Sequence, residues 1–225
     1  MGKIIAIEGI DGSGKSVQFR MLRDMLTREG KKVITMDFPE YESFFGKHIG
    51  RLLKGKMHTT AENVDPMSMA LWFALDRKMQ FEKGLPEYDY LLFNRYVLSN
   101  AAYQSSRCDN NTDLSPDEMI DWVIHMEHEE LKLPYPDIYL FLNITKQQAS
   151  SNVKNKGYRE YVGGEASDVY ENSDNRQNGA KNAYLRCAEK LGNVVVIECM
   201  EDGRMRSPEK IHCMIIDALR KNNII

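Results

Sequence analysis

The chain has 225 residues, and its 30 Lys and Arg against 33 Asp and Glu leave a net charge of −3. That length suits one α/β domain with a full core, and the balanced charge does not favour nucleic acid or an anionic membrane as a partner. The N-terminal apolar stretch is too short for a secretory signal, and no run of 18 apolar residues occurs. We therefore expect one domain over residues 1–225, without membrane association, in the cytoplasm.

Apolar runs alternate with helical patterns along the chain. Five continuous apolar runs predict strands over residues 3–7, 32–38, 89–94, 137–143 and 193–199. Helical spacing and capping residues predict helices over 15–28, 43–54, 66–82, 116–131 and from Pro208 onward. Strands that are apolar throughout and separated by helices indicate an α/β fold, with a five-stranded parallel sheet and helices on both faces.

A phosphate-binding motif follows the first predicted strand. The segment GIDGSGKS matches GxxxxGK[ST] and opens the first predicted helix. Its glycines let backbone N–H groups converge on phosphate oxygens, Lys15 neutralises the β- and γ-phosphates, and the Ser16 hydroxyl is a candidate Mg²⁺ ligand. The candidate ATP-binding residues are Gly9, Asp11, Gly12, Ser13, Gly14, Lys15 and Ser16.

The rest of the chain favours a kinase over a GTPase. A GTPase reads guanine with NKxD, whereas Asn155-Lys156 is followed by Gly157-Tyr158 without the Asp. Residues 152–179 are rich in Lys, Asn, Gly and Ser, and we interpret the part over about 152–166 as a lid segment that closes over nucleotide. An ordinary polar surface loop is the alternative. His125 and His128 are interpreted as an exposed helix face, because no third metal ligand has motif spacing.

Several motifs in one order resemble the bacterial thymidylate kinases. They are IAIEGIDGSGK (5–15), FPEY (38–41), LWFALDRK (71–78), NRYVLSNAAYQ (94–104), PYPDIYLFL (134–142) and SDVYE (167–171). The resemblance implies a P-loop nucleoside-monophosphate-kinase fold and a homodimer. It implies transfer of the γ-phosphoryl group of ATP to dTMP, giving dTDP, with Mg²⁺.

Candidate substrate-binding residues follow from spacing and from the resemblance. Phe73 and Arg77 share one helix face, so a ring that stacks on a base and a guanidinium that reaches its edge would read a pyrimidine. The alternative is core packing for Phe73 and a solvated Arg77. The resemblance adds Asn100 and Tyr103 near the base and sugar, with Tyr103 favouring deoxyribose. Further substrate-binding candidates are Phe38, Pro39, Tyr41, Asp168 and Tyr170.

The resemblance also implies catalytic roles and marks two departures. Asp11 faces the acceptor sugar and reacting phosphates, and Arg95 grips the acceptor phosphate. Some family members carry a catalytic Arg inside the P-loop; Gly12 stands there in this chain, so Lys154, Lys156 and Arg159 in the lid segment are the candidate cations. Asn94 stands where the family normally has Asp, and an amide brings no negative charge to the metal.

Two rival functions stay open. One is another P-loop nucleotide kinase, acting on dUMP, dCMP or a deoxynucleoside with the same machinery. The other is a catalytically weak P-loop nucleotide-binding protein, which Asn94 and the Lys-rich lid segment favour and which intact Lys15 and Arg95 oppose.

Overall fold

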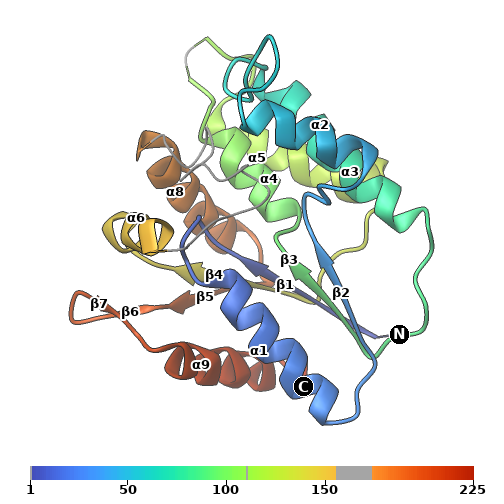
Figure 1. Cartoon of the computed structure of the whole chain (residues 1–225), viewed down its shortest axis with the longest axis vertical. Helices are drawn as coiled ribbons and strands as arrows, with labels where there is room; N and C mark the ends of the chain where they lie inside the picture. The colour runs from blue at the N-terminus through green and yellow to red at the C-terminus, as the bar shows by residue number, and fades with distance from the viewer. Residues whose placement is uncertain (1, 110, 156–173) are drawn as a thin grey trace.

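A single parallel sheet forms the centre of the molecule in the computed structural model, which describes residues 2–109, 111–155 and 174–225 (Figure 1). The strand order is β2-β3-β1-β4-β5, so the fold prediction is confirmed. The strands are β1 (Lys3–Glu8), β2 (Val33–Asp37), β3 (Tyr90–Asn94), β4 (Ile138–Asn143) and β5 (Val194–Glu198). Each lies within one residue of its predicted bounds. β1, β3 and β4 are buried almost throughout, as expected of strands covered on both faces.

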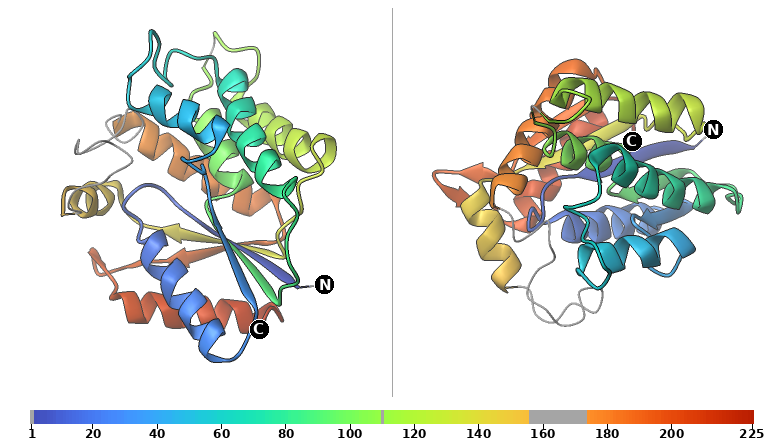
Figure 2. Two further views of the ribbon diagram at one scale, coloured as in Figure 1. Left: turned by 45° about the vertical axis from the view of Figure 1, so that its right-hand side comes forward. Right: turned by 90° about the horizontal axis from the view of Figure 1, so that it is seen from above.

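Helices cover both faces of this sheet. α1 and α9 lie against one face, and α3, α4, α5 and α8 lie against the other, with α2 beside α3 (Figures 1 and 2). The helices are α1 (Lys15–Arg28), α2 (Phe44–Leu53), α3 (Pro66–Phe81), α4 (Val97–Ser105), α5 (Pro116–His125), α6 (Lys146–Asn155), α8 (Asp174–Lys190) and α9 (Pro208–Lys221). Among the described residues, no helix is both long enough and apolar enough to cross a membrane.

Capping residues end and begin helices as the sequence predicts. Gly30 has φ 76° just after α1, where its N–H donates to Thr27 and the next N–H donates to Leu26. This pair of bonds is a Schellman motif, for which a residue without Cβ is favoured. Asp65 caps α3 by accepting from the Ser68 N–H, and Ser115 and Glu118 form a capping box on α5.

The predicted helix over 116–131 is divided in two. α5 ends at His125 and continues as the π-helical turn η1 (Met126–Glu130), in which the Leu131 N–H donates to the Met126 carbonyl. The expectation of an exposed face is therefore wrong for His128, although His125 is exposed. His128 is buried and contacts the Leu133 carbonyl through Nδ1. Its ring stacks on that of Tyr135, with 3.9 Å between the ring centres.

The polar segment 152–179 contains the ends of two helices whose bounds were not predicted. α6 extends to Asn155 and α8 begins at Asp174, so the described ends of this segment are helical. α8 is anchored by Ala180, Ala183 and Tyr184, which are completely buried at helical spacing. A small hairpin of β6 (Met200–Glu201) and β7 (Arg204–Met205) was not predicted either.

Candidate active site

A cavity of about 1000 Å³ opens at the carboxyl end of the sheet. The P-loop, the residues after β2 and β3, and the facing sides of α1, α3 and α4 line it. Its lining includes Asp11, Gly12, Gly14, Lys15, Ser16, Asp37, Phe38, Pro39, Tyr41, Phe73, Arg77, Asn94, Arg95, Asn100 and Tyr103. Predicted residues from four separate parts of the sequence therefore share one cavity, at the sheet edge where such folds bind ligands.

The P-loop folds as a glycine-dependent turn between β1 and α1. Gly12 and Gly14 have φ 83° and 89°, and Gly14 is the N-cap of α1. Lys15 Nζ donates to the carbonyls of Gly9 and Ile10 at 2.8 and 2.9 Å, while the exposed Ser16 lines the cavity. Gly9 and Ser13 are buried within the loop and do not line the cavity. The loop and the helix N-terminus together form an anion-binding site.

Gly12 is in close contact with α6. A Cβ at Gly12 would lie 2.3 Å from the Ala149 carbonyl oxygen, and the Gly12 carbonyl accepts from Asn152 Nδ2 at 2.8 Å. Asn152 Nδ2 also lies 3.1 Å from Met205 Sδ, which places the β6–β7 hairpin beside the same loop. The backbone at Gly12 thus has no room for a side chain unless α6 shifts.

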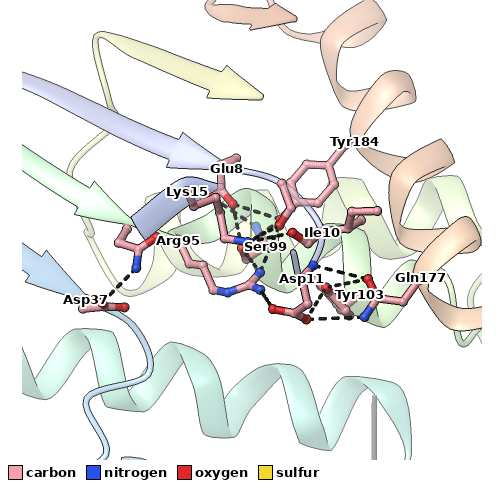
Figure 3. A network of polar contacts seen from close by, with 12 residues as sticks. Glu8, Ile10, Asp11, Lys15, Asp37, Arg95, Ser99, Tyr103, Gln177 and Tyr184 are labelled. Carbon is pink, nitrogen blue, oxygen red and sulfur yellow. Dashed lines mark hydrogen bonds and ion pairs between the residues drawn. The ribbon is translucent and has the colours of Figure 1, made fainter. Parts of the chain in front are cut away.

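Arg95 and Asp11, which both line the cavity, form an ion pair (Figure 3). Arg95 has φ 65°, an uncommon conformation for a residue with a side chain and one that is concentrated at functional sites. Its guanidinium also donates to the Gly9 carbonyl and to Ser99 Oγ. Burial alone would raise the pKa of Asp11, but the charges of Arg95 and Lys15 hold that pKa well below its usual range. Asp11 is therefore a carboxylate at neutral pH.

Tyr103 and Gln177 complete the surroundings of Asp11. The Tyr103 hydroxyl donates to Asp11 Oδ2 at 2.9 Å, and the Arg95 guanidinium lies 5.5 Å from the centre of the Tyr103 ring. Gln177 Oε1 accepts from the Asp11 N–H at 3.3 Å (Figure 3). Gln177 was not predicted as a site residue; it lies near the end of the polar segment 152–179, beyond the part interpreted as a lid. The buried spacing of Ala180, Ala183 and Tyr184 was the signal that could have revealed its helix.

A buried carboxylate fixes the start of α4 against β1. Glu8, completely buried, accepts from the N–H groups of Tyr96 and Ser99, from Ser99 Oγ and from the Tyr184 hydroxyl (Figure 3). An anionic side chain at a helix N-terminus satisfies its free N–H groups and interacts favourably with the helix dipole. This contact holds Arg95, which precedes α4, at the P-loop.

Arg77 and Asn100, predicted to bind the base of the phosphoryl acceptor, both contact Glu127, which was not predicted as a site residue. Arg77 is only 2% exposed, so the alternative of a solvated side chain is wrong. Its Nε and Nη2 donate to the two carboxylate oxygens of Glu127, each at 2.5 Å. Burial alone would lower the pKa of Arg77, but Glu127 raises it above the usual value, so the guanidinium stays charged. Asn100 donates to the same carboxylate at 2.8 Å.

Residues after β2 form another wall of the cavity. Phe38 is buried, and the Arg77 guanidinium lies 5.9 Å from the centre of its ring. Asp76, buried in α3, accepts from the Glu40 N–H and from Ser43 Oγ, which fixes the loop that carries Pro39 and Tyr41. Asn94 Nδ2 donates to Asp37 Oδ2 at 2.8 Å. Burial raises the pKa of Asp37, although this hydrogen bond opposes the shift.

Four predicted site residues, Lys156, Arg159, Asp168 and Tyr170, lie outside the described residues. Lys154 belongs to α6, but its side chain is outside the described part of the structure too. In the described part, no three His, Cys, Asp or Glu side chains group as a metal site would require.

Comparison with known proteins identifies the family. A family model for thymidylate kinase matches residues 7–202, which is most of the chain. The chain belongs to the thymidylate kinase family. Members of this family are phosphotransferases, so the chain is an enzyme of that class, as the sequence analysis predicts.

Individual relatives agree with this membership. A thymidylate kinase of Mycobacterium tuberculosis is 32% identical over 189 residues, covering 82% of this chain and 85% of the relative. The human thymidylate kinase is 28% identical over 152 residues, an alignment that covers 66% of this chain and 64% of the human protein. A Candida albicans thymidylate kinase structure superposes with a TM-score of 0.74 at 22% identity, covering 99% of this chain and 93% of the other. That structural likeness concerns the fold.

Proposed function

We propose that this thymidylate kinase family member transfers the γ-phosphoryl group of ATP to dTMP, giving ADP and dTDP. The observation that carries the proposal is the single cavity that joins the P-loop to Phe73, Arg77 and Asn100. Phosphoryl transfer requires that donor and acceptor be aligned and that the charge on the phosphates be neutralised. One cavity lined both by the phosphate-binding loop and by residues suited to bind a base meets that requirement.

The acceptor base would lie between Phe73 and the polar pair of Arg77 and Asn100. Phe73 is partly exposed and lines the cavity. A ring that stacks on a base has to be accessible in this way. Tyr103 would sit beside the sugar, where its ring takes the space of a 2′-hydroxyl. Phe38, Pro39 and Tyr41 would form the opposing wall.

Arg95 and Asp11 would handle the reacting phosphates. A dianionic acceptor phosphate competes with Asp11 for the Arg95 guanidinium, whose planar donors suit a phosphate. Asp11 is released toward the sugar side of the cavity when that exchange occurs. Lys15, now bonded to loop carbonyls, would turn to the β- and γ-phosphates of ATP.

Mg²⁺ fits the donor set at this edge of the sheet. When bound, it would neutralise charge on the phosphates. The Ser16 hydroxyl would bind it directly. Asn94 lines the cavity, and its Oδ1 is buried with no hydrogen-bond partner among the described residues, so it would be able to accept from a water of the metal. The Asp37 carboxylate beside it supplies the negative charge that Asn94 lacks.

We propose that the catalytic cation belongs to the lid segment, with Lys156 and Arg159 as candidates and Asp168 and Tyr170 following it. The close contact of Gly12 with Ala149 supports this assignment, because a P-loop Arg at residue 12 would collide with α6. Asn152 links α6, the helix that leads into the lid segment, to the Gly12 carbonyl.

We further propose a homodimer formed through α3. Leu71, Leu75 and Met79 repeat every four residues along one side of this helix and are 42%, 36% and 47% exposed. Exposed apolar side chains aligned along a helix are typical of a helix–helix interface. We also propose a cytoplasmic location, because ATP, the proposed phosphoryl donor, is present there.

A substrate panel tests the function. ADP release would be measured with ATP and Mg²⁺ in the presence of dTMP, dUMP, dCMP, thymidine or no acceptor. The proposal requires the highest kcat/KM with dTMP. Preference for dUMP, dCMP or a deoxynucleoside would establish the rival kinase, and nucleotide binding without acceptor-dependent ADP release would establish the weak binding protein.

A further inference from the structure

Glu127 contacts both Arg77 and Asn100, the two polar residues proposed to bind the base of the phosphoryl acceptor. It is completely buried, and it comes from the π-helical turn η1, which is separated from Arg77 by 50 residues and from Asn100 by 27. π-helical turns are rare and occur frequently at functional sites. A buried carboxylate is costly unless it is paired, and among the described residues the partners of this one are Arg77 and Asn100, which both line the cavity.

The contacts fix the orientation of the Asn100 amide. Nδ2 carries two hydrogens, and both are used: one goes to Glu127 Oε1 at 2.8 Å and the other to the Ala70 carbonyl at 3.0 Å. The opposite orientation would place Oδ1 against a carboxylate and a carbonyl, which are both acceptors. Oδ1 is buried, and no described residue donates to it. Asn100, which lines the cavity, therefore has an unused acceptor and no unused donor among the described contacts.

The same carboxylate fixes the face that Arg77 offers. Nε and Nη2 are held by Glu127, and among the described residues no hydrogen bond involves Nη1. The guanidinium cannot accept a hydrogen bond, so Nη1 is a donor only. Arg77 and Asn100 thus present a donor beside an acceptor, both almost completely buried.

We propose that Glu127 is the positioning residue that sets this donor–acceptor polarity, and that the polarity selects an acceptor base with an N–H beside a carbonyl. Thymine and uracil have this arrangement, with N3–H and O4. Cytosine has the reverse, because its N3 is an acceptor and its N4 a donor, so both groups would face like partners. The inference rests on the proposed function and adds to it the reason for rejecting dCMP.

Glu127→Gln tests the role of the carboxylate. The carboxamide has nearly the same shape but is neutral and offers a donor as well as an acceptor. It therefore no longer excludes the turned Asn100 amide, although the Ala70 carbonyl still opposes it, and Arg77 loses one hydrogen bond together with the charge of its partner. We expect the ratio of kcat/KM for dTMP to that for dCMP to fall at least about tenfold. The KM for dTMP should rise, while the KM for ATP stays within about twofold, which a general loss of structure would not produce.

Two controls accompany this variant. Glu129→Gln removes a charge from the same turn, at an exposed side chain whose partner is the Tyr135 hydroxyl, and should leave the ratio unchanged. Glu127→Asp keeps the charge and should retain more of the discrimination than Glu127→Gln. If Glu127→Gln folds and keeps the ratio of the original chain, the inference is overturned.

Nucleotide binding to the unmodified chain tests the polarity even if the Gln variant does not fold. Calorimetry would compare dTMP, dUMP, dCMP and dTMP methylated at N3. We expect dCMP and the N3-methyl compound to bind at least about thirtyfold more weakly than dTMP, because each leaves a buried polar group unpaired. Binding of dCMP as tight as that of dTMP would overturn the inference. Turnover of dUMP in preference to dTMP would instead refute the proposed substrate and leave the polarity intact.

Discussion

Asn94 and Asp37 are register partners at the carboxyl ends of β3 and β2, and Asn94 Nδ2 donates to Asp37 Oδ2 at 2.8 Å. Although residue 94 is an amide, a carboxylate therefore lies within hydrogen-bond reach of it. The negative charge at this edge of the sheet comes from the neighbouring strand.

Asn94→Asp should lower the Mg²⁺ concentration needed for half-maximal rate and leave the KM for dTMP within a few-fold. Two adjacent carboxylates repel each other and attract a hard divalent cation. The same repulsion should lower the melting temperature in a chelator, and Mg²⁺ should restore it. The measurement is a Mg²⁺ titration at saturating ATP and dTMP, with thermal unfolding beside it.

Asn143→Asp is the matched control. Asn143 donates to Glu198 at 2.8 Å across the ends of β4 and β5, and neither residue lines the cavity. Its variant should not change the Mg²⁺ requirement. An Asn94→Asp enzyme that needs as much Mg²⁺ as the original would show that Asn94 does not contact the metal's waters.

Arg77→Ala should raise the KM for dTMP with little change for ATP, and it should also destabilise the fold. Removing Arg77 leaves the buried Glu127 carboxylate without its charged partner, which costs roughly 3–5 kcal/mol. The double variant Arg77→Met with Glu127→Leu should recover most of that stability and none of the dTMP recognition. Denaturant unfolding and steady-state kinetics on both variants separate the two roles. Recovery of the normal KM for dTMP in the double variant would mean that Arg77 is structural only.

Gly12→Ala should destabilise the chain more than Gly30→Ala. Both glycines have positive φ, which costs a residue with a Cβ about 1–2 kcal/mol, but a Cβ at Gly30 meets nothing within 4 Å. At Gly12 the added atom also collides with the Ala149 carbonyl. Gly12→Arg should therefore lower both the melting temperature and kcat instead of supplying a second catalytic cation. Equal destabilisation by the two Ala variants would show that α6 does not restrict Gly12.

Replacing Lys154, Lys156 and Arg159 together with Ala should lower kcat much more than it weakens dTMP binding. A cation that meets the transferring phosphoryl group has its largest effect in the transition state. Single-turnover kinetics and calorimetry with dTMP measure the two effects separately. A triple variant with near-normal kcat would exclude the lid segment as the source of the charge.

His128 should make stability depend on pH below neutrality. Burial lowers the pKa of His128, so the unfolded chain binds a proton at about pH 6.5 that the folded chain does not yet bind. The free energy of unfolding should fall as pH decreases from about 6.5, until the buried ring itself becomes protonated. His128→Gln should flatten this dependence, and His125→Gln, at an exposed ring, should not. Denaturant unfolding between about pH 7 and pH 5 measures the difference.

Local patterns in the sequence were sufficient for the sheet and the phosphate site. Strand bounds follow from continuous apolar runs, and the Gly9–Ser16 loop follows from glycines whose backbone conformation other residues rarely adopt. These features depend on residues that are neighbours in the chain. Residue spacing also placed Phe73 and Arg77 on one side of a helix.

Only the tertiary structure decided which side chains meet at the cavity. Arg77 and Glu127 are 50 residues apart, Asn94 and Asp37 are 57 apart, and Gln177 reaches Asp11 across 166. Glu127 lies in a stretch rich in charged residues that is typical of a solvated helix, and its burial depends on the π turn and on α3 and α4 packing over it. A single sequence records composition and periodicity, whereas the pairing of a buried charge is settled by the packing of distant elements.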